Sequence, residues 1–147
     1  MKDDTRNPAP ASRKFPYHLA LRATLRDTDG VGHVNNAVYL TWTEEARTAY
    51  ALERCGLSSL SELDFILAAA QLDYRSPVEL NEIVDLWCGP SRVGARSWEM
   101  RYEGRARGDG RLVFEARTVQ VHYDYRERRS APISAPWRRI LEEDLIR

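Results

Sequence analysis

The chain contains few cysteines and few histidines. Its 147 residues include two cysteines, Cys55 and Cys88, which have neither the short spacing of metal ligands nor that of a redox pair. The three histidines, His18, His33 and His122, have no cysteine or second histidine at ligand spacing. We therefore expect no zinc site, and two thiols that stay reduced and partly buried.

The charges are balanced, and no long apolar run is present. The 22 acidic residues cancel the 22 basic ones, which are arginines apart from Lys2 and Lys14. No charge excess indicates nucleic acid or a membrane surface as a partner. The first sixteen residues lack the apolar segment of a signal peptide, and no run reaches transmembrane length. The sequence predicts a cytoplasmic protein with a flexible N-terminal tail over residues 1–16.

Residues 17–147 are enough for one domain with its own core. Apolar and polar side chains alternate from Tyr17 to Leu25, which indicates a half-buried strand. Asn35 or Asn36 can cap a helix over about 36–54 that closes at Gly56. Further strands are expected over Phe65–Tyr74, Ile83–Cys88, Ser97–Arg105 and Leu112–Tyr123.

The sequence also predicts the burial of one strand and the end of another. The segment 65–74 is apolar at both parities, which is typical of a strand covered on both faces. The run Gly89-Pro90-Ser91 is expected to end the strand before it. With one strand, one long helix and four antiparallel strands, the pattern predicts an α+β domain in which the helix packs on one curved sheet.

A Gly-rich turn with a carboxylate comes directly before the expected helix. The first turn of a helix leaves about four N–H groups unpaired and carries about half a positive charge. A developing oxyanion can be held there, while a carboxylate attacks, or aims water at, the same carbonyl carbon. The run is Asp27-Thr28-Asp29-Gly30-Val31-Gly32-His33-Val34-Asn35-Asn36-Ala37-Val38-Tyr39.

This run resembles the signature of the hotdog-fold acyl-CoA thioesterases, in the branch that includes 4-hydroxybenzoyl-CoA thioesterase and the long-chain acyl-CoA thioesterases. It matches every fixed position of the pattern Asp-x-Asp-x-x-Gly-His-Val-Asn-Asn-x-x-Tyr. The resemblance extends over roughly residues 17–137 and includes the closing stretch 128–133. It implies a single hotdog domain over 17–147, with a five-stranded antiparallel sheet wrapped around one long central helix.

The resemblance also implies roles for residues of the run. Asp29 would be the catalytic base or nucleophile, although Asp-Gly pairs also favour turns without any chemistry. The backbone N–H near Asn36 would polarise the thioester carbonyl. His33 would brace the loop through hydrogen bonds, and Asn35 would support it as a helix cap. Tyr39 would line the acyl pocket.

Three other carboxylates compete with Asp29. Asp27 is two residues away, so in an extended chain its side chain points to the opposite face, and we expect it to be a turn partner. Glu44 and Glu45 lie on the helix, and at about 1.5 Å per residue Glu45 is roughly 13 Å from the helix start. Ion pairs, such as Glu44 with Arg47, are the role that we expect for them.

CoA carries phosphates, and these suit bidentate arginine contacts. The run 91–97 resembles the family strand beside the nucleotide entrance, which makes Arg92, Arg96 and Ser97 candidate CoA contacts. The resemblance implies an acyl-CoA thioesterase that needs no cofactor and forms a homodimer or homotetramer, with acyl pockets at the subunit interface. An acyl-carrier-protein thioesterase and a non-catalytic acyl-CoA binding module are the alternatives.

Overall fold

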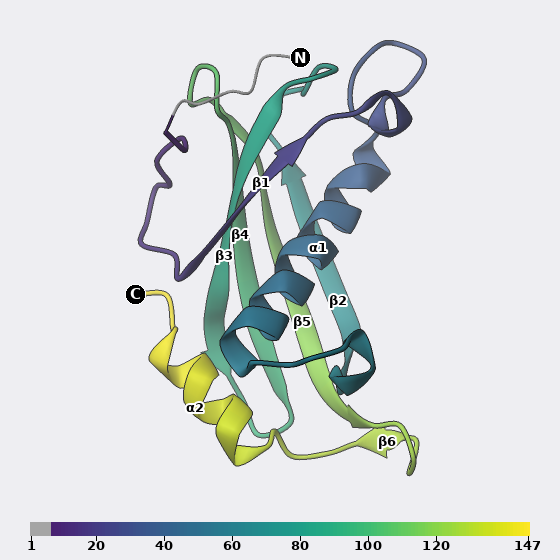
Figure 1. Ribbon diagram of the computed structural model, residues 1–147, viewed down its shortest axis with the longest axis vertical. Helices are drawn as coiled ribbons and strands as arrows, with labels where there is room; N and C mark the ends of the chain where they lie inside the picture. Colours follow the sequence, from purple (N-terminus) through teal and green to yellow (C-terminus); the bar gives the residue numbers. More distant parts are fainter. Residues whose placement is uncertain (1–6) are drawn as a thin grey trace.

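An antiparallel sheet curves around one long helix in the computed structural model, which describes residues 7–147 (Figure 1). The helices are α1 (Asn36–Cys55) and α2 (Ala135–Glu143). The strands are β1 (Tyr17–Arg22), β2 (Phe65–Tyr74), β3 (Ile83–Val93), β4 (Ser97–Ala106), β5 (Leu112–Asp124) and the short β6 (Arg129–Ser130). The predicted α+β architecture, with five main strands and one central helix, is confirmed. No helix within 7–147 is long and apolar enough to cross a membrane.

The strands follow the order β1-β3-β4-β5-β2, and β6 pairs with the outer end of β5. All pairs are antiparallel. β1 and β2 are consecutive strands, yet they lie at opposite edges because α1 connects them across the sheet. Phe65 pairs with His122 and Tyr74 pairs with Phe114, which fixes the two ends of β2 against β5.

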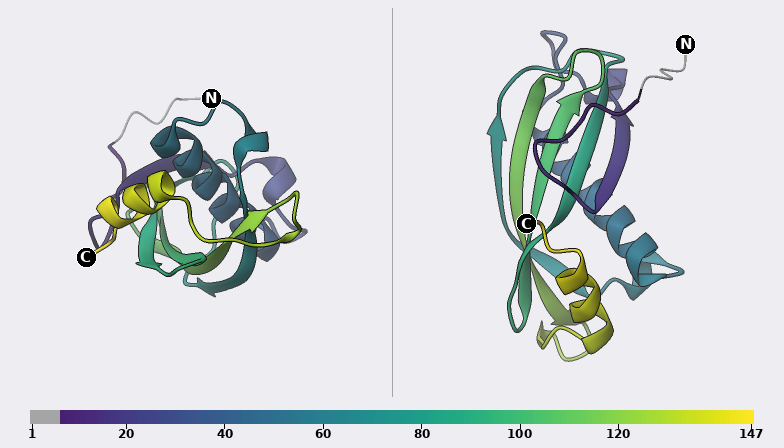
Figure 2. Two further views of the ribbon diagram at one scale, coloured as in Figure 1. Left: turned by 90° about the horizontal axis from the view of Figure 1, so that it is seen from below. Right: turned by 90° about the vertical axis from the view of Figure 1, so that its left-hand side faces the viewer.

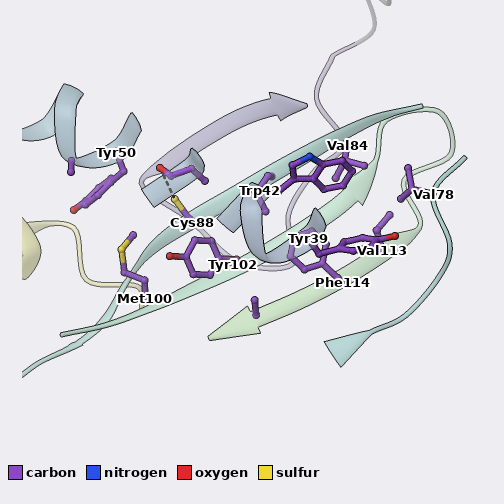
Figure 3. Packing of buried hydrophobic residues seen from close by; sticks show 14 of the residues in the cluster. Tyr39, Trp42, Tyr50, Val78, Val84, Cys88, Met100, Tyr102, Val113 and Phe114 are labelled. Atoms are coloured by element: carbon purple, nitrogen blue, oxygen red, sulfur yellow. Dashed lines mark hydrogen bonds between the residues drawn. The ribbon is translucent and has the colours of Figure 1, made fainter. Parts of the chain in front are cut away.

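α1 begins and ends at residues with suitable cap chemistry. The Asn35 side chain accepts a 2.9 Å hydrogen bond from the Ala37 N–H, and Gly56 closes the helix at φ 62, a conformation that favours glycine. The inner face of the helix packs on the concave side of the sheet, where aromatic residues of both layers meet (Figure 3). Cys88 lies in this core and donates a hydrogen bond from its thiol to the Ala46 carbonyl.

Two strand boundaries differ from the sequence prediction, and one helix was not predicted. β3 continues through Gly89-Pro90-Ser91, because a register shift between Pro90 and Arg92 absorbs the irregularity and strand pairing resumes beyond it. β1 ends at Arg22, since residues 25–27 turn into a short 3₁₀ helix. The sequence pattern did not indicate α2, whose Trp137 and Leu141 are buried against the core.

β2 is not covered on both faces within one chain, so that prediction is wrong for the single subunit. Most of its side chains are exposed, including Ile66 at 38% and Leu67 at 41%. β5 pairs with one of its edges, and no other described strand pairs with the opposite edge. The outer edge of the sheet is therefore open and apolar.

The described part of the expected tail packs on the convex face of the sheet, on the side away from α1 (Figure 2). The Ala9 N–H donates to the buried Asp85 carboxylate at 2.9 Å, and the Ser12 N–H donates to Glu103 at 2.7 Å. The Trp87 indole N–H donates to the Ala9 carbonyl at 3.1 Å. Residues 1–6 lie outside the described residues, whereas the segment 9–12 is held by these bonds and is not a loose tail.

Candidate active site

The loop before α1 closes on itself as a tight turn. Thr28 and Val34 form an antiparallel bridge, and the Asp29 N–H donates to the His33 carbonyl at 2.8 Å. The Gly32 N–H donates back to the Asp29 carbonyl at 3.2 Å, and Gly32 has φ +86, which favours a residue without a Cβ. This backbone geometry explains both the Gly-rich composition and the fixed place of Asp29 beside the helix.

The Asp29 carboxylate combines a structural bond with a free oxygen. Its Oδ1 accepts hydrogen bonds from the Val31 N–H at 2.9 Å and, more weakly, from the His33 N–H at 3.4 Å. Its Oδ2 accepts no hydrogen bond from residues 7–147, and the side chain is exposed. The turn interpretation and the chemical one are therefore compatible, because the turn occupies only one of the two oxygens.

The helix start offers a free backbone donor. The Asn35 N–H donates to the Asp27 carbonyl at 2.8 Å, which links the cap to the end of the preceding 3₁₀ turn. The Ala37 N–H is used by the Asn35 side chain, whereas the Asn36 N–H finds no acceptor among the described residues. Asn35 is thus the N-cap, and Asn36 presents the donor that the resemblance assigns to the thioester carbonyl.

Asp27 lines a groove that Asp29 does not line. Its Oδ2 accepts hydrogen bonds from both the N–H and the hydroxyl of Thr24, each at 2.7 Å, so the side chain caps the short 3₁₀ turn. Asp27 and Glu45 line an open groove of about 850 Å³ together with Trp42. Burial raises the pKa of Glu45, and the charge of Asp27 raises it further. Both carboxylates therefore belong to this groove.

His33 is exposed, whereas Tyr39 is buried. The His33 backbone pairs with Glu79, but the exposed imidazole makes no hydrogen bond with any described residue, so the loop is braced through its main chain. Tyr39 is buried in the core, where it packs edge-on against Phe114 with ring centroids 5.1 Å apart (Figure 3). It also packs edge-on against Tyr74, with centroids 5.3 Å apart. Within residues 7–147, no group of three His, Cys, Asp or Glu side chains could hold a metal ion.

The candidate CoA contacts lie at the opposite end of the same subunit. Ser97 pairs with Val121, which pairs with Ile66 near the start of β2, whereas the helix start contacts Tyr74 at the end of β2. Ten strand residues separate these ends by roughly 30 Å at about 3.3 Å per residue. One chain therefore does not bring the run 91–97 to Asp29. Arg92 is exposed, and Arg96 donates to the Ser130 carbonyl at 2.7 Å.

Sequence reasoning missed a pocket of about 590 Å³ between α1 and the start of β2. Arg47 lies in its wall and is only 5% exposed. Glu44 lines the same pocket, but no ion pair joins it to Arg47 or to any other described residue, so the predicted Glu44–Arg47 pair is wrong. The reason is that Arg47 points beneath the helix, where it donates to the Tyr102 hydroxyl at 3.3 Å. The available sequence signal was the position of Arg47 directly after Ala46 and three residues before Tyr50, on an apolar side of the helix.

Comparisons with known proteins give one consistent family. The family described as the thioesterase-like superfamily matches residues 23–141. A thioesterase from Thermus thermophilus, solved with coenzyme A and zinc, is 29% identical, covers 88% of this chain and 94% of its own, and superposes with a TM-score of 0.78.

Two further solved structures are similar. A 1,4-dihydroxy-2-naphthoyl-CoA thioesterase from Synechocystis is 25% identical over 86% of this chain and 96% of its own, with a TM-score of 0.77. A predicted thioesterase from Bacillus stearothermophilus is 23% identical over 88% of this chain and 96% of its own, with a TM-score of 0.81. The last of these bears on the fold alone.

Proposed function

Because the chain belongs to the thioesterase-like superfamily, we propose that it hydrolyses acyl-CoA thioesters to a free acid and CoA. The predicted hotdog fold and the thioester hydrolase class are confirmed by the superfamily match over residues 23–141. The choice of CoA over another carrier is supported by the Thermus thermophilus relative, solved with coenzyme A, and by the Synechocystis relative, named for a CoA thioester.

The observation that supports the mechanism is that two polar groups, the Asp29 Oδ2 and the Asn36 N–H at the start of α1, have no hydrogen-bond partner among the described residues. The thioester carbonyl oxygen accepts from the Asn36 N–H, whose position at the positive end of α1 stabilises the oxyanion that develops there. Asp29 either removes a proton from the attacking water or attacks the carbonyl carbon itself to give a mixed anhydride, which water then hydrolyses. In both routes the C–S bond breaks, and CoA leaves as a thiolate that takes up a proton.

We propose that the working unit is at least a homodimer joined through the open edge of β2. The exposed apolar side chains of β2 and the lack of a described strand on its outer edge support this assembly. In such a dimer Arg92, Arg96 and Ser97 would serve the reaction site of the other subunit, since in their own subunit roughly 30 Å separates them from it. Arg92 is more available than Arg96 to donate hydrogen bonds to a phosphate, because Arg96 already donates to the Ser130 carbonyl.

A matched pair of variants tests the proposal. Asp29→Asn keeps the Oδ1 acceptor for the Val31 N–H but removes the negative charge, so the turn survives while thiol release from acyl-CoA falls by about 10²–10⁴ in kcat. Asp27→Asn removes a charge two residues away, in the other groove, and should cost far less. Near-normal turnover of Asp29→Asn would exclude it as the catalytic carboxylate. Faster hydrolysis of acyl-pantetheine than of acyl-CoA would favour a carrier-protein substrate.

A further inference from the structure

Arg47 is a buried cation whose charge no carboxylate of the described chain balances. Only 5% of the residue remains exposed to solvent. It makes one hydrogen bond, to the neutral Tyr102 hydroxyl at 3.3 Å, and its Nε is buried without any partner. Taking a guanidinium out of water without pairing it is costly, so the site is incomplete as it stands. The missing partner must reach Arg47 through the pocket that it lines.

The open edge of β2 indicates what lies next to that pocket. Phe65 and Leu67 of β2 form one of its walls. The middle of β2, Ala68-Ala69-Ala70, is small and uncharged, and the strand has no lysine, arginine or proline to oppose the addition of another strand. A second copy of the same apolar strand fits this edge, because each copy then covers the surface that the other exposes.

Two-fold symmetry fixes how the two copies are arranged. When the axis is perpendicular to the sheet, both α1 helices stay on the same side and the two β2 strands pair antiparallel. The Phe65 end of one strand then lies beside the Tyr74 end of the other. Tyr74 is bonded to Asn36, so the helix start of one subunit faces the Arg47 pocket of its partner. Within one chain these two places are roughly 16 Å apart along α1, at about 1.5 Å per residue.

We propose, resting on the function proposed above, that Arg47 acts in trans. Its guanidinium completes the reaction site formed by Asp29 and Asn36 of the other subunit, where it donates hydrogen bonds to an oxygen atom of the substrate. The oxygen belongs either to a polar substituent of the acyl group or to an amide carbonyl of the pantetheine arm. In both cases the guanidinium gains an acceptor on the side where it lines the pocket.

Hybrid dimers, which combine two different variant subunits, show whether Arg47 serves the site of its own subunit or that of the other subunit. Asp29→Asn and Arg47→Met are coexpressed with different affinity tags, and dimers carrying both tags are purified. If Arg47 serves the other subunit, one site of the hybrid keeps both residues and the other loses both, so kcat per dimer returns to about half of the wild-type value. If both residues serve the same subunit, neither site is intact. Hybrid activity equal to the mean of the two parents would overturn the inference.

The single variants carry their own readouts. Loss of a charge-assisted hydrogen bond should lower kcat/KM of Arg47→Met by about 10- to 100-fold. Unchanged kcat/KM of Arg47→Met on both acyl-CoA substrates named below would overturn the inference. Arg47→Gln replaces Arg47→Met if circular dichroism shows that the methionine variant is not folded. Tyr102→Phe is the matched control, because it removes the one protein hydrogen bond of Arg47 and leaves the guanidinium in place. An equal loss in Tyr102→Phe would mean that Arg47 acts through packing, and would overturn the inference.

Two substrates identify which substrate oxygen Arg47 contacts. Hexanoyl-CoA and adipoyl-CoA have acyl chains of equal length, but only adipoyl-CoA ends in a carboxylate, so kcat/KM of Arg47→Met is measured on both. A loss in Arg47→Met confined to adipoyl-CoA supports recognition of the acyl group, and an equal loss on both supports recognition of the pantetheine arm. The proposed function is judged separately by Asp29→Asn alone. An inactive Asp29→Asn with a hybrid that stays inactive overturns the trans arrangement only, whereas an active Asp29→Asn overturns both.

Discussion

The Tyr74 hydroxyl donates a 2.8 Å hydrogen bond to the backbone carbonyl of Asn36, so the last residue of β2 is tied to the first residue of α1. The ring of Tyr74 also packs edge-on against Tyr39, with centroids 5.3 Å apart. These two contacts set the position of the helix start relative to the sheet. The proposed oxyanion donor, the Asn36 N–H, belongs to the same residue that Tyr74 holds.

Tyr74→Phe should therefore lower turnover more than substrate binding. Phenylalanine keeps the ring contact with Tyr39 and loses the hydroxyl, which costs about 1 kcal/mol of folding stability. A helix start that is less well held should reduce kcat by about 3- to 10-fold and leave KM nearly unchanged. Steady-state kinetics and urea unfolding measure the two effects. Reduced stability with an unchanged kcat would show that the bond serves the fold alone.

The open edge of β2 leads to a prediction about assembly. Light scattering of the wild-type protein at micromolar concentration should report a dimer or a larger even assembly. Ile66→Lys places a charge on the exposed apolar face of β2 and should shift the protein toward monomers, with a parallel loss of activity because each site is shared.

Leu25→Lys is the control for this experiment, since Leu25 is an exposed apolar residue in the other groove, away from β2. It should leave the assembly unchanged. A wild-type protein that is monomeric and fully active would contradict both the dimer and the shared site.

The elements nearest to the proposed chemistry were the most predictable from sequence. α1 was expected over about 36–54 and is found over Asn36–Cys55, because an asparagine cap and a closing glycine mark its ends. β2 was expected at its observed bounds. The Asp29 loop was predictable because a tight turn needs its particular residues in order, so local chemistry alone specifies it.

The features that depend on contacts between distant residues could not be predicted. Asp85 looked like an ordinary polar residue of a strand, although it is fully buried and binds Ala9, 76 positions away. Arg47 looked like a surface partner of Glu44, because helix spacing does not reveal that a side chain passes beneath its own helix. The distance between Arg92 and Asp29 required the strand order, which the sequence pattern left open.

Asp85 anchors the N-terminal segment to the convex face of the sheet. Its carboxylate accepts hydrogen bonds from the Ala9 N–H at 2.9 Å and from Arg107 Nε at 3.1 Å, and it lies 2.7 Å from His18 Nε2. Burial alone would raise the pKa of Asp85, but these hydrogen bonds and the charge of Arg107 outweigh it and hold the pKa below its usual value. The ionised form is therefore the one that stabilises the fold.

This direction fixes how stability should depend on pH. An aspartate in an unfolded chain has a pKa near 3.9, and that of Asp85 in the folded protein is lower, so its contribution is fully present above about pH 4 and is lost as the pH falls through the folded value. Asp85→Asn should cost roughly 3 kcal/mol at pH 7, because it removes one charge of a buried pair. Urea unfolding between pH 5 and pH 2 should then show a shallower loss of stability for Asp85→Asn than for the wild type. Equal slopes for Asp85→Asn and the wild type would show that Asp85 does not anchor the segment through its charge.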